Sequence, residues 1–351
     1  MLTSQQLGKN TGLSVSKLCL GTMNFGEPGR GHQGDWTLGV DDARPIFQAA
    51  IEHGVNYFDC ADIYGVGASE IVVGQLLKEL LPRDEYALTT KVSMPMGRAP
   101  NQGGLSRKHI MEGVDQSLKR LGHDYVDQLI IHRHPHGIPG LAQTPIEETM
   151  EALNDVVKAG KALYLGASSM FAWQFAELQM TAAQNGWTKF ISMQNHLNLI
   201  YREEEREMIP YCIKTGVAIT PWSPLARGIL AGAYQGGFDK GSTTDHPAKT
   251  ESALNRCIRA RTSLRSRIAL SRLPKNTVKP QPRSLLLGCL PLRVLFARLS
   301  AYRKPPSLQI WLRRPPLNSQ RMMSPILRPC ISQLRICCRR ECLRRPPNAT
   351  L

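Results

Sequence analysis

Short apolar runs alternate with longer amphipathic segments from Lys17 to Trp222. Seven of the runs have the length and composition of buried β-strands, namely Lys17–Thr22, Val55–Asp59, Ala87–Val92, Val126–His132, Ala162–Ser168, Phe190–Gln194 and Val217–Trp222. Six segments between them carry apolar residues at helical spacing, namely Asp41–His53, Glu70–Leu81, Arg107–Leu121, Ile146–Ala159, Ala172–Asn185 and Glu203–Thr215. Repeated βα units of this kind predict an α/β fold with a parallel sheet.

The residues that end the predicted helices support this interpretation. Five of the predicted helices are followed by a glycine at the usual C′ position, namely Gly54, Gly122, Gly160, Gly186 and Gly216. Seven repeats of such regular period favour a (β/α)₈ TIM-type barrel over an open sheet, with the eighth βα unit absent or disrupted. A small hairpin is predicted at Leu7–Val15, ahead of the barrel.

The net charge of +16 is unevenly distributed along the 351 residues. Residues 1–245 hold 21 Lys and Arg against 26 Asp and Glu, whereas residues 246–351 hold 23 against 2. We therefore divide the chain into a barrel at 1–244 and a basic, Arg/Pro-rich tail at 245–351. Proline is concentrated in the tail, no helical or strand period is sustained there, and we expect it to be disordered and unable to supply the missing βα unit.

The remaining composition indicates an ordinary reducing compartment. No run of eighteen apolar residues is present and the first residues do not resemble a signal peptide, so a cytoplasmic protein without a membrane partner is expected. The three cysteines of the first part, Cys19, Cys60 and Cys212, have neither zinc-ligand nor disulfide spacing.

Candidate chemistry gathers where three successive strands end. The second strand runs into Asp59 and then Tyr64, the third ends near Lys91 and the fourth at His132. Barrel enzymes place their reacting groups at the carboxyl ends of strands. Reduction of a carbonyl needs a proton donor, which Tyr64 could supply if Lys91 stabilises its ionised form, Asp59 holds Lys91, and His132 polarises the substrate oxygen.

Each of these residues also has an ordinary structural interpretation. A strand-end aspartate is often a helix cap, a lysine a surface charge, a tyrosine a half-buried ring and a histidine a satisfied core residue. Their joint occurrence on successive strands favours the catalytic interpretation. No second set of acid, base and nucleophile competes, because His134 and His136 lie beyond the strand in a loop.

Four motifs resemble those of the aldo-keto reductase family, and the resemblance covers residues 7–244. They are Val15-Ser-Lys-Leu-Cys-Leu-Gly-Thr-Met-Asn-Phe-Gly26, Asn56-Tyr-Phe-Asp-Cys-Ala-Asp-Ile-Tyr-Gly65 with Ser69-Glu70 and Gly74, Leu118-Lys-Arg-Leu-Gly122 with Asp124-Tyr-Val-Asp-Gln-Leu129, and Trp222-Ser-Pro-Leu-Ala-Arg-Gly228. The resemblance implies that Asp59, Tyr64, Lys91 and His132 form the catalytic tetrad.

The same resemblance implies NADPH as cofactor, bound without a Rossmann fold. It implies contacts with the nicotinamide end from Ser168, Ser169 and Gln194, ring stacking by Trp222, and contacts with the pyrophosphate from Ser223, Leu225 and Arg227, with Thr22 and Asp59 also at the cofactor. Ser168-Ser169 departs from the family, in which many members have Ser-Asn. The loop Asn24–Leu38 and the region around Trp173 are candidate walls of the substrate pocket.

The basic tail has two explanations, a genuine appendage or translation in a shifted frame. Codons can be chosen for Gln309–Leu334 so that the frame two bases on gives an alanine-rich, acidic segment like the end of an aldo-keto reductase. The same procedure on Gln281–Lys304 gives an alanine-rich helix and a strand-like run, which would be the eighth unit. We therefore favour a single-base insertion or deletion between Thr244 and Asn255, which would remove part of the cofactor anchor.

These observations lead to one function and several alternatives. The leading prediction is NADPH-dependent reduction of an aldehyde or ketone, with a small carbonyl compound as the substrate. The alternatives are a nucleotide-sensing regulatory barrel of the same fold, a truncated reductase without activity, and, less favoured, nucleic-acid binding by the tail. The substrate and the oligomeric state are not determined by the sequence.

Overall fold

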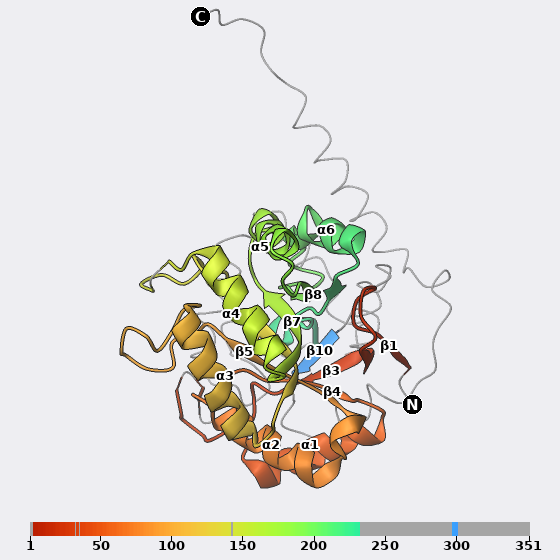
Figure 1. Ribbon diagram of the computed structural model, residues 1–351. Helices are drawn as coiled ribbons and strands as arrows, with labels where there is room; N and C mark the ends of the chain where they lie inside the picture. Colours follow the sequence, from red (N-terminus) through yellow and green to blue (C-terminus); the bar gives the residue numbers. More distant parts are fainter. Residues whose placement is uncertain (1–2, 32, 35, 142, 232–296, 301–351) are drawn as a thin grey trace, which may run out of the picture.

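A parallel β-sheet forms the centre of the molecule, with helices packed around it (Figure 1). The computed structural model describes residues 3–31, 33–34, 36–141, 143–231 and 297–300. The sheet has the order β10-β3-β4-β5-β6-β7-β8-β9, and all of its ladders are parallel. Its strands are β3 (Leu18–Gly21), β4 (Tyr57–Asp59), β5 (Ala87–Val92), β6 (Val126–Ile131), β7 (Ala162–Ser168), β8 (Phe190–Gln194), β9 (Ala218–Ile219) and β10 (Ala297–Ser300).

Helices connect the strands and cover the outer face of the sheet (Figure 1). They are α1 (Val40–Glu52), α2 (Ala68–Leu80), α3 (Arg107–Leu121), α4 (Ile146–Lys158), α5 (Ala172–Gln184) and α6 (Met208–Thr215), with 3₁₀ turns η1 (Arg83–Glu85), η2 (Glu203–Glu205) and η3 (Ala226–Ala231). The α3 helix shows how local sequence sets the bounds. Ser106 accepts a hydrogen bond from the backbone of His109 at the start, and Gly122 ends the helix with φ 65°.

The predicted fold class is confirmed, and so are the seven strands before residue 245. One predicted helix was wrong in its extent, because Glu203–Thr215 is divided into η2 and α6. Pro210 lies in the first turn of α6, where its missing N–H is tolerated.

The eighth βα unit is disrupted, as predicted, and the described residues of the tail form one short strand. Backbone residues Ala297–Ser300 pair with β3 in parallel, with Ala297 opposite Leu18 and Ser300 opposite Gly21. A ladder needs only main-chain N–H and C=O groups, and this four-residue stretch contains no proline. Within the described residues no ladder joins β9 to β10. The rest of the predicted tail lies outside the described residues.

The amino-terminal hairpin closes one end of the barrel. Strands β1 (Ser4–Gln6) and β2 (Ser14–Ser16) pair antiparallel, as predicted around Leu7–Val15. Buried Leu7 and Val15 pack in one apolar cluster with residues at the amino ends of four strands, namely Cys19, Tyr57, Ala87 and Ala218. The hairpin therefore seals the amino-terminal end and leaves the carboxyl ends of the strands as the accessible mouth.

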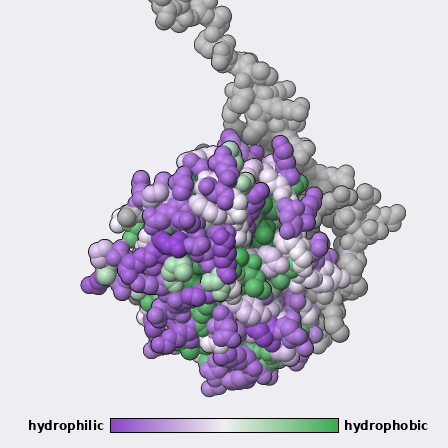
Figure 2. Space-filling model, in the orientation of Figure 1, coloured by the Kyte–Doolittle hydropathy of each residue, from purple (hydrophilic) through white to green (hydrophobic). Residues whose placement is uncertain are grey.

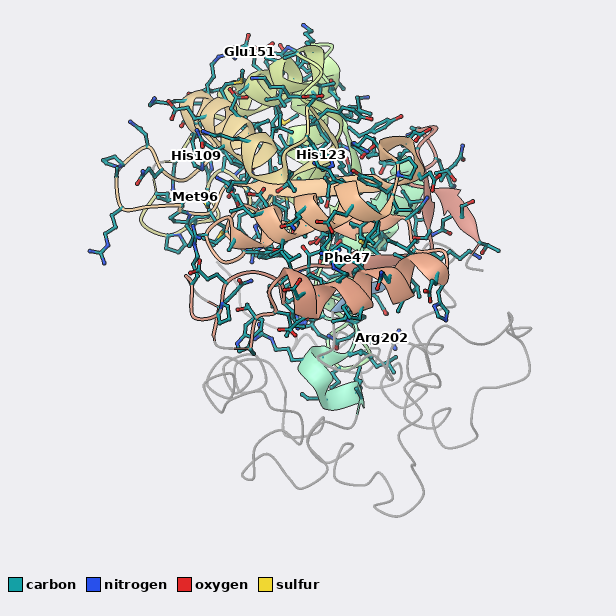
Figure 3. All side chains as sticks on the ribbon, turned by 90° about the horizontal axis from the view of Figure 1, so that it is seen from below. Phe47, Met96, His109, His123, Glu151 and Arg202 are labelled. Atoms are coloured by element: carbon teal, nitrogen blue, oxygen red, sulfur yellow. The ribbon has the colours of Figure 1, made fainter. Side chains whose placement is uncertain are left out.

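The main apolar core lies between the sheet and the surrounding helices. Phe47 of α1, which is labelled in Figure 3, packs between Phe25 and Phe58 at ring-centroid distances of 5.2 and 5.6 Å. Burying a ring of this size contributes about 1.5–3 kcal/mol. Gly74 lets α2 approach α3 closely, because a Cβ there would collide with the carbonyl of Leu121.

The face of the molecule seen in Figure 2 is predominantly polar, with smaller apolar areas among the polar side chains. This distribution follows the amphipathic pattern of the helices. Among the described helices, none is both long and apolar enough to cross a membrane.

Candidate active site

The side chains singled out by the sequence come from the ends of neighbouring strands. Asp59 is the last residue of β4 and Lys91 lies in β5, while His132 directly follows β6. The register places Asp59 opposite Thr89, and Lys91 opposite Ile130. Parallel pairing brings these three strand ends to one edge of the sheet, at the mouth of the barrel.

Asp59 and Lys91 form an ion pair in the interior. The Lys91 Nζ lies 2.8 Å from Asp59 Oδ2, and the two side chains are 0% and 1% exposed. The other carboxylate oxygen of Asp59 accepts hydrogen bonds from Thr89 Oγ1 at 2.9 Å and Gln194 Nε2 at 3.0 Å. Lys91 also donates to the carbonyl of Cys60 at 2.5 Å. Removing two charges from water costs free energy that the ion pair alone does not fully offset. These hydrogen bonds offset part of the remaining cost.

The buried ammonium group also reaches Tyr64. Its distance to Tyr64 Oη is 3.5 Å, and it lies 5.0 Å from the centre of the ring. Tyr64 occupies a tight turn between β4 and α2, in which its N–H donates to the carbonyl of Ala61 at 3.2 Å. His132 meets the same ring edge-on, with 6.0 Å between ring centroids and 82° between the planes. The four predicted catalytic residues are therefore neighbours.

A second buried acidic group supports the turn that carries Tyr64. Asp62 is 1% exposed, its N–H donates to the carbonyl of Lys91 at 3.3 Å, and its Oδ1 accepts from the N–H of Ile63 at 2.6 Å. Its Oδ2 is buried without a hydrogen-bond partner in the described part of the chain. Burial and then the charge of Glu70 raise the pKa of Asp62 well above its ordinary value. Glu70 itself is paired with Arg120 at 2.6 Å.

We expect Asp62 to make stability depend on pH. Its pKa is raised in the folded state, so its contribution is fully present below the unfolded value of about 4 and is lost as pH rises through the folded value. Asp62→Asn should therefore gain stability relative to the unchanged protein as the pH rises above about 4, by about 1–3 kcal/mol, the usual cost of an unsatisfied buried polar group. Urea unfolding at several pH values measures this difference.

The matched control for that experiment is Asp84→Asn, at an exposed position. If the Asp62 and Asp84 variants gave the same pH dependence, the raised pKa of Asp62 would be incorrect.

The predicted contacts with the nicotinamide end lie at the ends of β7 and β8. Ser168 is opposite Gln194 in the ladder, and its Oγ donates to the Gln194 carbonyl at 3.0 Å. The Ser169 Oγ accepts from Trp222 Nε1 at 2.9 Å and lies 3.1 Å from Ser168 Oγ. Ser169 has φ 52°, a left-handed conformation that a residue with a Cβ rarely adopts. Such strain is typical of functional positions.

Trp222 is held in a stack of three rings that the sequence did not predict. His196 is the middle ring. It lies parallel to Trp222, with 4.1 Å between ring centroids and 9° between the planes, and its opposite face stacks on Tyr201 at a centroid distance of 4.3 Å. Burial, and then the charge of Arg227, lower the pKa of His196 to about 4. The imidazole is therefore neutral at physiological pH. The only sequence signal was the position of His196 just after the end of β8.

The segment after Trp222 contains the remaining predicted cofactor residues. Ser223 and Arg227 have φ values of 52° and 55°, again left-handed, and Leu225 is buried. Arg227 is exposed, as expected for a group that meets a ligand. Thr22, in contrast, is fully buried and donates from Oγ1 to the Asp59 carbonyl at 3.0 Å, which anchors β3 to β4.

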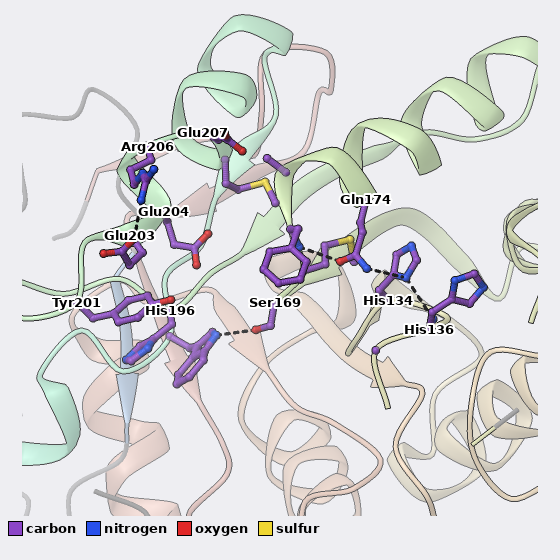
Figure 4. Close-up of a pocket in the computed structure, with 16 residues that line it drawn as sticks. His134, His136, Ser169, Gln174, His196, Tyr201, Glu203, Glu204, Arg206 and Glu207 are labelled. Atoms are coloured by element: carbon purple, nitrogen blue, oxygen red, sulfur yellow. Dashed lines mark hydrogen bonds and ion pairs between the residues drawn. The ribbon is translucent and has the colours of Figure 1, made fainter. Parts of the chain in front are cut away.

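A cavity of about 580 Å³ opens beside these residues (Figure 4). Ser169 and Trp222 line it together with residues of three loops at the carboxyl ends of β6, β7 and β8. Figure 4 shows the His196 stack on one side and the hydrogen-bonded pair of His134 and Gln174 on the other. Burial lowers the pKa of His134 to about 4. The cavity is large enough for part of a cofactor or a small substrate.

Other chemistry is not favoured by the described residues. Burial and the charge of Glu70 raise the pKa of the Cys60 thiol to about 12, so it is not a nucleophile at neutral pH. No group of three His, Cys, Asp or Glu side chains in the described ranges has the arrangement of a metal site.

Comparison with known proteins identifies the family to which the chain belongs. The model of the aldo/keto reductase family matches residues 17–274, a range that continues past Asp245. Versiconal hemiacetal acetate reductase of Aspergillus parasiticus is 43% identical over 282 residues, covering 75% of this chain and 78% of that protein. Aldo-keto reductases of Alternaria alternata and Fusarium vanettenii are 41% and 46% identical, covering 77% and 63% of this chain and 81% and 64% of their own lengths.

These matches define the class of protein as oxidoreductases that reduce carbonyl groups with a nicotinamide cofactor. The chain belongs to the aldo/keto reductase family.

Proposed function

We propose that this protein reduces an aldehyde or ketone to the alcohol with NADPH, using Tyr64 as the general acid. The observation that carries the proposal is the buried Lys91 ammonium group, which contacts both Asp59 and the Tyr64 hydroxyl. A phenol is a weak acid in water, and a fixed cation beside its oxygen favours proton release. His132, whose ring lies edge-on to that of Tyr64, is placed to hydrogen-bond the substrate oxygen.

The residues at the mouth fit a nicotinamide cofactor. Trp222 lines the cavity, and its ring is fixed by Ser169 on its indole nitrogen and by His196 on one face. The hydroxyl of Ser169 accepts from Trp222, so its own hydrogen can be donated to a carboxamide. We propose that Ser168, Ser169 and Gln194 hold the nicotinamide end, that Trp222 stacks on its ring, and that Ser223, Leu225 and Arg227 contact the pyrophosphate. Thr22 and Asp59 are proposed to lie at the cofactor as well.

The bound cofactor supplies a hydride to the carbonyl carbon. The chain's own residues handle the oxygen. Tyr64 gives its proton to the oxygen as negative charge develops there, and Lys91 stabilises the phenolate that remains. Asp59 keeps Lys91 in place and compensates its charge in the interior. The phenolate then regains a proton from solvent, which restores the starting state.

We also propose that the native reading frame ends near Thr244 and that residues 245–351 result from a shifted reading frame. The change of net charge from −5 to +21 at this point and the lack of aspartate after Asp245 support the proposal. Sequencing the gene across codons 240–260 tests it directly.

The function is tested on two proteins, the chain as written and a version with the frame restored. NADPH oxidation is followed with a panel of aromatic and aliphatic aldehydes, and NADPH binding by fluorescence titration. We expect turnover by the restored protein and much weaker NADPH binding by the chain as written. NADPH binding without turnover of any carbonyl would support a nucleotide-sensing barrel. Equal solubility and affinity of the two proteins would contradict the frameshift.

A further inference from the structure

Arg133 stands directly between two parts of the site. It follows His132, whose ring contacts Tyr64, and precedes His134, which lines the cavity. Its Nη1 donates to the carbonyl of His132 at 2.7 Å, so the guanidinium folds back over the end of β6. The side chain is half-buried at the mouth of the barrel.

The charge of Arg133 is not compensated by an acidic side chain in the described ranges. Seven described arginines are paired with Asp or Glu, namely Arg30, Arg44, Arg83, Arg107, Arg120, Arg202 and Arg206. Arg98, Arg133 and Arg227 have no such pair among the described residues. Arg98 and Arg227 are exposed and can be fully hydrated, whereas Arg133 is half-buried.

Two features of its surroundings act on the charge of Arg133. Burial lowers its pKa, and the nearby Tyr64 hydroxyl opposes this shift. Arginine stays protonated in proteins, so a half-buried guanidinium without an acidic neighbour keeps a positive charge that no counter-charge balances. A carboxylate would balance this charge, and its two oxygens can accept two parallel hydrogen bonds from the guanidinium group.

We infer that Arg133 is a specificity-determining residue that binds a carboxylate on the substrate, so that the protein prefers carbonyl compounds that carry an acidic group. The inference rests on the proposed reductase function and narrows its substrate class. Arg133 would hold the anionic end while Tyr64 and His132 act on the carbonyl oxygen.

The test compares 2-, 3- and 4-formylbenzoate with their methyl esters, which have the same ring and aldehyde but no charge. The full chain, in the written and frame-restored forms, is assayed as wild type and as Arg133→Met, Arg133→Lys and the exposed control Arg98→Met. In the wild type we expect at least tenfold higher kcat/KM for one formylbenzoate isomer than for its ester. Arg133→Met should lose about 10–100-fold with that acid and less than threefold with the ester, and Arg133→Lys should recover part of the loss.

Calorimetric titration with the same acid and ester separates the two proposals. If no carbonyl is reduced but the acid binds to the wild type and not to Arg133→Met, the reductase function fails and the inference about Arg133 holds. If the aldehydes are reduced without preference for the acid, or if Arg133→Met loses equally on acid and ester, the inference is overturned and the reductase function stands. Absence of both binding and turnover would overturn both.

Discussion

Tyr64→Phe is expected to lower kcat for carbonyl reduction by about a thousandfold, within the range of 10²–10⁴ typical of a lost general acid. The substitution removes one oxygen and leaves a ring of the same shape in the turn between β4 and α2. NADPH affinity should stay within about threefold, because the phenol is proposed to act on the substrate oxygen and not on the cofactor. Steady-state kinetics and fluorescence titration in the frame-restored protein measure the two quantities.

The control for this variant is Tyr125→Phe, which lies at the opposite end of the barrel just before β6. It should leave kcat unchanged. Turnover of Tyr64→Phe at the level of the unchanged protein would exclude Tyr64 from the mechanism. A large loss of NADPH affinity would instead place the phenol at the cofactor.

Lys91→Met should lower kcat by a comparable factor, because the cation that stabilises the ionised phenol is removed. It also leaves the Asp59 carboxylate buried without its ion-pair partner, and breaking a buried pair in this way costs about 3–5 kcal/mol of stability. Part of the lost activity could therefore reflect unfolding. Kinetics must be combined with thermal unfolding of the same preparations.

The double variant Asp59→Asn with Lys91→Met separates the two effects. It removes both charges, so much of the lost stability should return while kcat stays low. Lys78→Met, at the end of α2, is the surface control for loss of a lysine. If activity returned together with stability in the double variant, Lys91 would be structural and not part of the chemistry.

Much of the barrel could be predicted from the sequence because its elements are encoded locally. Apolar runs such as Ala87–Val92 are buried along their whole length, and the predicted bounds of this strand agree with β5. The end of α3 was marked by Gly122, whose φ of 65° a residue with a side chain would resist. At Glu203–Thr215, in contrast, the periodic pattern alone placed the helix bounds incorrectly.

The proximity of Asp59, Tyr64, Lys91 and His132 could be expected for a similar reason. Each lies at or just beyond a strand end, and in a parallel barrel all strand ends meet at one edge. The sequence thus determined which residues share the mouth. It did not determine their contacts, since the distance between Lys91 Nζ and Tyr64 Oη depends on the exact register of β4 against β5.

Only the tertiary structure decided which distant groups become partners. Asp62 is acidic in the sequence, but its raised pKa depends on burial beside Glu70, and the stack of His196 on Trp222 depends on β8 and β9 lying side by side. The pairing of Ala297–Ser300 with β3 uses main-chain groups that almost any residue provides. Sequence patterns record the period and burial of each element, whereas contacts between elements follow from strand register and packing, which no local pattern specifies.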